Sequence, residues 1–143
     1  MPHRSVRSII ANQTPLSASP ETTVTEAAGL MKRGKVGALM VVERGRLAGI
    51  FTERDALFRV IAEGRDPQAT RLADVMTRDC QTIAPDKPLG HALHMMYEGG
   101  FRHVPVVENG APLGMVSARD ALGPELEEFE LDLVKREHIR EIL

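Results

Sequence analysis

The sequence predicts an α/β protein of two β-α-β-β-α repeats related by a pseudo-twofold axis, with helices packed on small mixed sheets. The first observation is a self-match at an offset of 65 residues, where 13 of 38 ungapped pairs are identical. The second is that both copies show the same succession of apolar patterns. The third is the composition, 43% hydrophobic and 27% charged, which is typical of a globular chain. We therefore expect a first repeat at 7–63, a linker at 64–71, a second repeat at 72–123 and a C-terminal helix at 124–143.

Each copy is expected to open with a short strand, at 16–18 and 81–83, followed by a helix. The helices are predicted at 24–33 and 89–98, because apolar residues recur there at helical spacing on one stripe. Both follow a segment with proline or acidic residues, which favours a helix start. Glycines directly after the two stripes indicate where the helices end.

A hairpin and a second helix complete each copy. Apolar strands are predicted at 38–42 and 47–51, and again at 104–107 and 113–116, with a glycine in each connecting turn. The second of these turns contains Asn-Gly, the strongest short hairpin signal. A hydroxyl residue then precedes the second helix of each copy, as is usual for an N-cap.

Charge and composition exclude several classes of function. The formal net charge is −2 and the chain has four Phe, one Tyr and no Trp, so we expect no nucleic-acid partner. No apolar run approaches the roughly 20 residues that span a bilayer, and we expect no membrane partner. The single cysteine forms no internal disulfide. These features favour a cytoplasmic protein.

Two copies of one motif set carry a family resemblance. Each copy has a Val-Val-Glu strand, a Gly-x3-Gly hairpin and then Thr52-x-x-Asp55 or Ser117-x-x-Asp120; the second also has Arg102-His103-Val-Pro-Val-Val. The chain resembles the CBS domain, named after cystathionine β-synthase, in the tandem pair called a Bateman module. The resemblance implies a tandem CBS-domain pair that binds adenosine-containing ligands between its two sheets. It also implies a homodimer, as a disc of four repeats.

The Thr/Ser-x-x-Asp motifs have two interpretations. The hydroxyl and the carboxylate three residues later match a capping box at a helix start. An ionised aspartate can instead accept both hydroxyls of a ribose diol, while the free N–H groups of a helix N-terminus bind phosphate. The residues alone leave the two interpretations evenly balanced, and the resemblance favours a ligand site in at least one copy.

Arg102 and His103 precede the second copy's Val-Pro-Val strand. They are either a solvated strand end or a clamp for phosphate, since Arg is always charged and His donates when protonated. The resemblance favours the clamp. The first copy has Lys35-Val36-Gly37-Ala38 at this place, so its phosphate contacts are doubtful, and its glycine is expected to leave room for adenine.

The resemblance also implies two crossed sites, each built from both repeats, with aliphatic walls around the adenine. The site anchored by Ser117 and Asp120 would borrow Ser17, Val36 and Ala38. The site anchored by Thr52 and Asp55 would borrow Thr82, Ile83, Phe101, Arg102 and His103.

Two functions are therefore weighed. The first is a regulatory, ligand-sensing module that binds AMP, ADP or ATP, with S-adenosylmethionine and NAD(H) as further candidates, and signals to a regulated protein. The second is a dimerising scaffold with vestigial pockets. Aspartate in both copies favours the first. We expect neither an enzyme nor a required cofactor, because no nucleophile–base pair is identifiable. His91 and His94 lack a third metal ligand at a recognised spacing, so no metal site is predicted.

Overall fold

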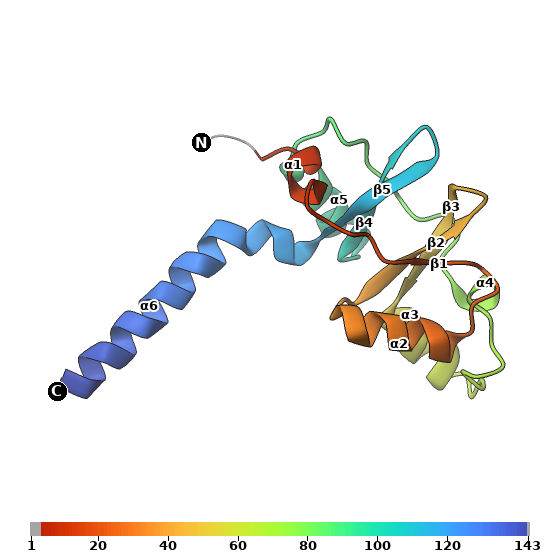
Figure 1. Ribbon diagram of the computed structural model, residues 1–143, viewed down its shortest axis with the longest axis horizontal. Coiled ribbons are helices and arrows are strands. Elements are labelled where there is room, and N and C mark those ends of the chain that lie inside the picture. The colour runs from red at the N-terminus through yellow and green to blue at the C-terminus, as the bar shows by residue number, and fades with distance from the viewer. Residues whose placement is uncertain (1–3, 143) are drawn as a thin grey trace.

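The computed structural model describes residues 4–142, and it describes side chains for residues 4–123 and 131–140. Two small sheets carry short helices, and one long helix projects from the second half (Figure 1). The elements up to the middle of the chain are α1 (Val6–Ile10), β1 (Ser17–Ala18), α2 (Val24–Gly34), β2 (Ala38–Glu43), β3 (Arg46–Thr52), α3 (Glu53–Asp55) and the π-helical η1 (Ala56–Ile61). They continue with α4 (Leu72–Val75), α5 (Leu89–Gly99), β4 (His103–Glu108), β5 (Ala111–Ser117), the 3-10 helix η2 (Ala118–Leu122) and α6 (Gly123–Ile142).

The observed architecture is the predicted α/β pair. The first sheet has the order β1-β2-β3, with β1 parallel and β3 antiparallel to β2, and the second consists of the antiparallel pair β4-β5. Both hairpins shift register at the same place, between Val41 and Val42 and between Val106 and Val107. Equivalent irregularities in both copies support the duplication that the sequence indicates.

The strand predicted at 81–83 is wrong in length, because the observed pairing is shorter. Residues 81–83 form only a single parallel bridge, between Ile83 and Val106. In the first repeat the backbone N–H of Met40 donates to the Leu16 carbonyl oxygen at 3.1 Å. Its counterpart in the second repeat is Pro105, which has no N–H to donate, so the parallel pairing cannot extend.

The helix ends follow the expected local chemistry. Thr23 and Glu26 form a reciprocal capping box at the start of α2, which ends at Lys35 with a left-handed φ of 55°. Helix α5 starts after Pro88 and ends at Gly100, whose φ is 72°. Both helices pack against their sheets through the apolar stripe read from the sequence.

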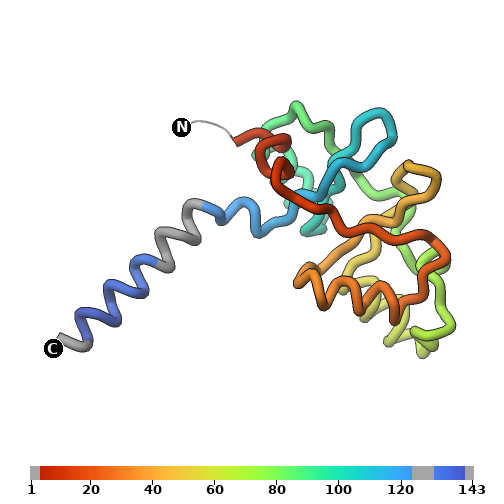
Figure 2. The backbone as a smooth tube through the Cα atoms, in the orientation of Figure 1, coloured from red at the N-terminus to blue at the C-terminus, as the bar shows by residue number. Residues whose placement is uncertain are grey.

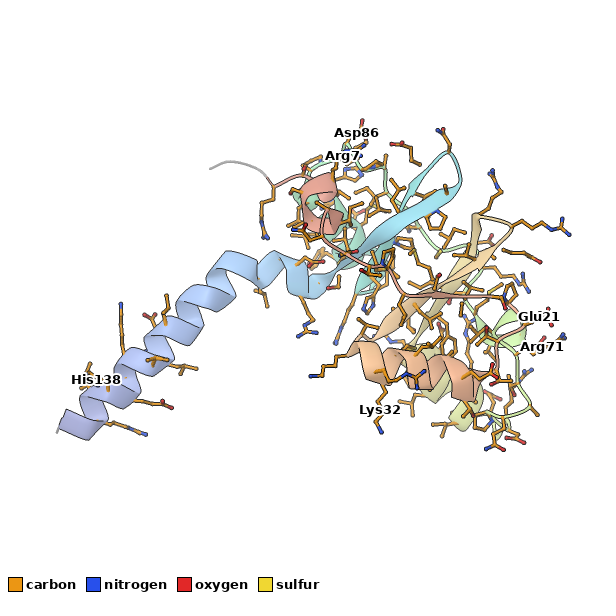
Figure 3. All side chains as sticks on the ribbon, in the orientation of Figure 1. Arg7, Glu21, Lys32, Arg71, Asp86 and His138 are labelled. Atoms are coloured by element: carbon orange, nitrogen blue, oxygen red, sulfur yellow. The ribbon has the colours of Figure 1, made fainter. Side chains whose placement is uncertain are left out.

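The hydrophobic core of each repeat includes a short helix from a different part of the chain. Val6 and Ile10 of α1 lie in the core of the second repeat. Leu72 and Val75 of α4 lie in the core of the first. An ion pair of 2.7 Å between Arg71 and Glu21 fixes the start of α4 beside the turn that precedes α2 (Figure 3). Side-chain packing therefore crosses the boundaries of the sequence repeat.

Helix α6 leaves the second repeat and extends away from both sheets (Figure 2). Leu131, Leu133, Val134 and Ile139 on this helix are 43–62% exposed. Within residues 4–142, no helix combines the length and the apolar character needed to cross a membrane.

Candidate functional site

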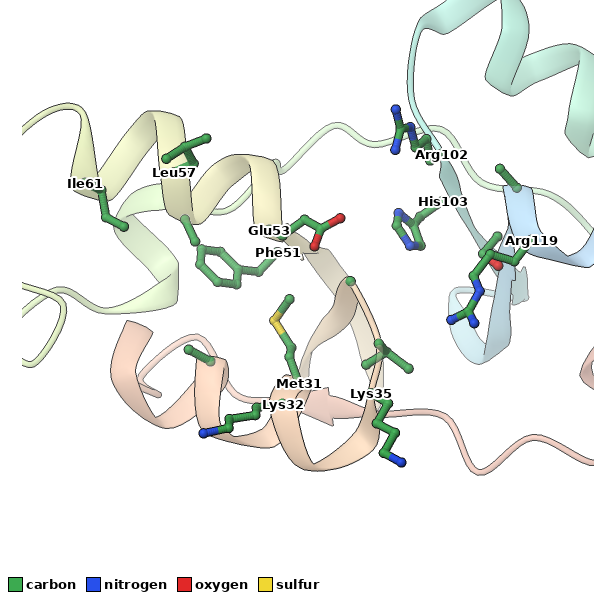
Figure 4. A pocket seen from close by; sticks show the side chains of 16 residues that line it. Met31, Lys32, Lys35, Phe51, Glu53, Leu57, Ile61, Arg102, His103 and Arg119 are labelled. Carbon is green, nitrogen blue, oxygen red and sulfur yellow. The ribbon is translucent and has the colours of Figure 1, made fainter.

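A cavity of about 620 Å³ lies between the two repeats (Figure 4). That volume is within the range usual for small-molecule sites. Its lining comes from α2, the segment after it, β3, α3, η1, the start of β4 and the end of β5 with η2. The lining residues are Ala28, Met31, Lys32, Lys35, Val36, Gly37, Phe51, Glu53, Ala56, Leu57, Ile61, Arg102, His103, Ser117, Ala118 and Arg119.

One wall of the cavity is apolar and belongs to the first repeat. Met31 of α2 and Phe51 of β3 extend from the core to this wall, and the partly exposed Leu57 and Ile61 of η1 continue it. Thr52 caps α3, and the π-helical η1 continues directly from α3, so the start of this helical segment sets where these two side chains lie. The wall offers a surface suited to a flat, weakly polar group.

The other wall is polar and belongs to the second repeat. His103 begins β4 and Ser117 ends β5, and the antiparallel register places these two residues opposite each other. The Ala118 N–H donates to the Arg102 carbonyl oxygen at 2.9 Å, which closes the hairpin at this end. Arg102, His103 and Ser117 thereby line the cavity together, and Figure 4 shows the first two side by side at the start of β4.

Asp55 is held in a structural network and does not line the cavity. Its Oδ2 accepts from the Thr52 N–H at 3.0 Å and from the Thr52 hydroxyl at 3.1 Å. Its Oδ1 accepts from the Thr77 hydroxyl at 3.4 Å and pairs with the Arg59 guanidinium at 3.5 Å. Asp55 is only 7% exposed, and both of its carboxylate oxygens have partners within the protein: the capping box engages Oδ2, and Thr77 and Arg59 engage Oδ1.

Asp120 is less enclosed than its counterpart. Its Oδ2 accepts from the Ser117 N–H at 2.7 Å and from the Ser117 hydroxyl at 3.4 Å. Among the side chains that the structure describes, none donates to its Oδ1. Asp120 does not line the cavity itself, but it contacts Ser117, which does.

Burial lowers the pKa of His103 below its ordinary value, and the Arg102 guanidinium adds to this effect. The Glu53 and Asp120 carboxylates act in the opposite direction. Burial prevails, because removing an imidazolium from water penalises the charged form. His103 is therefore neutral at pH 7 in the empty cavity.

The sequence predicted two separate sites, and this one cavity is lined by some residues of each. Val36 and Ser117, expected in one site, lie here beside Arg102 and His103, which were expected in the other. Eight further candidates do not line this cavity. They are Ser17 and Thr82, which are exposed; Ala38, Asp55 and Ile83, which are buried; and Thr52, Phe101 and Asp120, which are partly buried.

Several lining residues were not singled out by the sequence. Glu53 and Arg119 lie inside the two Thr/Ser-x-x-Asp motifs, at positions where only the hydroxyl and the carboxylate were considered. Lys32 and Lys35 flank the glycine that ends α2. Position within a motif was the available signal for Glu53 and Arg119. Lys35 belongs to the segment 35–38, where the sequence made phosphate contacts doubtful, and Lys32 carried no signal.

The residues that correspond to this lining at the offset of 65 residues make different contacts. Arg54, the counterpart of Arg119, donates from Nη1 to the Gly100 carbonyl oxygen at 3.2 Å and so links the repeats. Phe101, the counterpart of Val36, packs on the second core and directly against Gly99. The two halves of the pair are therefore unequal.

Comparisons with known proteins identify the family and agree with the fold. The family model described as "CBS domain" matches residues 6–62 and 72–124. The mitochondrial CBS domain-containing protein CBSX3 of Arabidopsis thaliana is 35% identical over 123 residues, which cover 82% of this chain and 60% of that protein. The chain thus spans less than two thirds of that relative.

Two solved structures resemble the whole pair. A putative signal-transduction protein with CBS domains from Burkholderia ambifaria matches with a TM-score of 0.79 and 29% identity, over 86% of this chain and 94% of that one. The CBS domain pair of protein MJ0100 matches with a TM-score of 0.76 and 25% identity, over 90% and 99% of the two chains. That structure is a complex with 5′-methylthioadenosine and S-adenosyl-L-methionine.

Proposed function

Because the chain belongs to the CBS domain family, whose tandem pairs are regulatory ligand-binding modules, we propose that it senses an adenosine-containing nucleotide in the cavity between its repeats. Occupancy of the cavity is then signalled to a partner protein. The observation that carries this proposal is the joint lining of one cavity by an apolar wall and by Arg102, His103 and Ser117.

The chemistry of the two walls suits the parts of such a ligand. Met31, Phe51 and the exposed apolar residues of η1 offer the base a surface that it can contact without a buried charge. Arg102 on the opposite wall offers a forked cation for phosphate. Ser117 and the adjacent Asp120 offer hydroxyl and carboxylate oxygens to a ribose. The adenosine compounds bound to the pair of MJ0100 are consistent with this assignment.

Both repeats lie against the cavity, and this gives a physical route for the signal. A ligand that contacts the first repeat through its base and the second through its phosphate stabilises one relative placement of the two sheets. The regulated protein then recognises the occupied state. S-adenosylmethionine and NAD(H) share the adenosine part and remain candidates beside AMP, ADP and ATP.

We also propose a homodimer. Phe58 on η1 and Tyr97 on α5 are 56% and 88% exposed, although both are large and apolar in most of their surface. Leu57 and Ile61 add to the exposed apolar surface of η1. A second copy that covers these helices would remove this surface from water.

Calorimetric titration and thermal unfolding with adenosine compounds test the proposed function. A ligand present at about 100 times its dissociation constant should add about 2.7 kcal/mol to the free energy of unfolding. We expect one strong site per chain and a clear loss of affinity in Arg102→Gln and Ser117→Ala. Absence of binding by every adenosine compound, with the protein folded, would reject the proposal.

A further inference from the structure

The cavity carries more positive charge than its motif residues account for. The lining includes four permanent cations, Lys32, Lys35, Arg102 and Arg119, and one carboxylate, Glu53. With His103 neutral, as derived above, the lining charge is +3. Such an excess in one open cavity attracts anions and favours those that carry several charges.

Two of these cations, Lys32 and Lys35, have no cationic counterpart in the other repeat. At the offset of 65 residues, the counterparts of Lys32 and Lys35 are Tyr97 and Gly100. Arg119 does have an arginine counterpart, Arg54, but that side chain is bonded to the Gly100 carbonyl. The fold of the repeat therefore does not require cations at positions 32 and 35, since the second copy forms the equivalent helix with Tyr97 and Gly100 there.

Two of the cations, Lys35 and Arg119, lie away from the apolar wall. Figure 4 shows Lys35 and Arg119 projecting toward the same side of the cavity, one from each repeat, while Phe51 and Leu57 lie at the other end. Glu53 and His103 lie between these ends, whereas Arg102 lies beyond His103, at the edge of the cavity farther from Lys35 (Figure 4). A ligand placed with its base on the apolar wall extends its anionic arm past His103 toward Lys35 and Arg119.

We propose that the natural ligand is a nucleotide with two or more phosphates, and that Lys35 and Arg119 bind the distal phosphate. The inference rests on the proposed function, because it assumes that a nucleotide occupies this cavity. Charge balance supports it. A monophosphate of about −2 leaves the lining positive, whereas a diphosphate of about −3 neutralises it.

The test is calorimetry on the full chain with adenosine, AMP, ADP and ATP, at pH 7.5 and without divalent cations. We expect ADP and ATP to bind about tenfold more tightly than AMP. Lys35→Gln and Arg119→Gln should each weaken ADP binding about three- to tenfold and leave adenosine binding nearly unchanged. Arg33→Gln is the matched control, since Arg33 lies beside Lys32 on α2 but does not line the cavity.

Two outcomes would overturn the inference and leave the proposed function in place. One is AMP binding as tightly as ADP and ATP. The other is an equal loss of adenosine and ADP affinity in Lys35→Gln and Arg119→Gln. Titration with inorganic pyrophosphate distinguishes failure of the proposed function from failure of the phosphate subsite. If no adenosine compound binds while pyrophosphate binds in a manner that depends on Lys35 and Arg119, the proposed function fails and the polyphosphate subsite stands.

Discussion

Asp55 and Asp120 occupy equivalent positions in the two repeats, yet their carboxylates have different surroundings. Asp55 is buried and bonded to Thr52, Thr77 and Arg59. Asp120 is half-buried, and its bonds go to Ser117 alone among the described side chains. The same motif therefore serves structure in the first repeat and leaves an oxygen available in the second.

This difference predicts separate phenotypes for two identical substitutions. Asp55→Ala leaves buried donors without an acceptor and should lower the free energy of unfolding by on the order of 1–3 kcal/mol. Asp120→Ala should cost less stability but weaken nucleotide binding about tenfold to a hundredfold, because charge-assisted bonds to the ribose are lost. Urea unfolding and calorimetry on both variants measure the two effects. Unchanged nucleotide affinity in Asp120→Ala would reject its assignment to the ribose.

Asp120→Glu adds a second check on this residue. Glutamate is the usual partner in a capping box, so a purely structural role predicts a neutral or stabilising change. A role in ribose binding predicts weaker binding, since the added methylene displaces both oxygens. We expect a well-folded variant with reduced affinity.

His103 makes stability depend on pH. Its pKa is lowered by burial and by Arg102, against the opposing carboxylates of Glu53 and Asp120. Below about pH 6.5 the unfolded chain takes up a proton on this residue before the folded chain does. The His103 contribution therefore destabilises the ligand-free protein as pH falls below about 6.5 and vanishes above it.

Urea unfolding of the wild type and of His103→Asn between pH 8 and pH 5 isolates this contribution. The wild type should lose more stability than the variant over the acidic part of the range. A bound phosphate reverses the preference, since it favours the imidazolium, so nucleotide affinity should rise more steeply toward pH 6 in the wild type than in His103→Asn. Parallel pH profiles of the two proteins would contradict the role of His103.

At the scale of elements, each hairpin is crossed by a segment from elsewhere in the chain that hydrogen-bonds to its second strand. Thr77 pairs with Ile50 through two backbone hydrogen bonds of 2.9 Å. Gln13 forms the equivalent pair with Met115 through its side-chain amide, at 2.8 and 3.0 Å. Gly49 of β3 lies next to Thr77. A Cβ at Gly49 would lie 2.6 Å from the Thr77 carbonyl oxygen. This contact explains a glycine inside a strand.

Gly49→Ala should therefore destabilise the protein by about 1–3 kcal/mol, because the backbone at Thr77 must move away. Gly90→Ala is the control, since nothing lies within 4 Å of a Cβ at that helical position. We expect Gly90→Ala to be neutral or to stabilise the fold slightly. Thermal and urea unfolding of the two variants give the comparison, and equal stability of both would refute the crossing as the constraint.

At the scale of the whole molecule, the exposed helical faces predict self-association. We expect analytical ultracentrifugation at micromolar concentration to find a dimer. Phe58→Glu and Tyr97→Glu should shift it toward the monomer without unfolding, because both side chains are already exposed in the single chain. Lys87→Glu, an exposed change in a loop, serves as control. A wild-type chain that remains monomeric under these conditions would exclude the dimer.

The duplication, the two hairpins and the helices α2 and α5 were predictable from the sequence. Their signals are local: apolar spacing, capping residues such as Thr23, and turn residues such as Asn109 with Gly110. Arg102, His103 and Ser117 were candidate site residues from the motifs and the family resemblance, and the structure places all three in the lining of one cavity.

Only the tertiary structure decided how the two copies differ. Periodicity cannot show that α1 packs on the second repeat and α4 on the first, because both short helices satisfy the same pattern in either place. Nor can a motif show that Asp55 is enclosed by Thr77 and Arg59 while Asp120 is not. Lys35 and Arg119 meet at one cavity only because the repeats pack face to face, and such a juxtaposition depends on contacts between residues far apart in the chain.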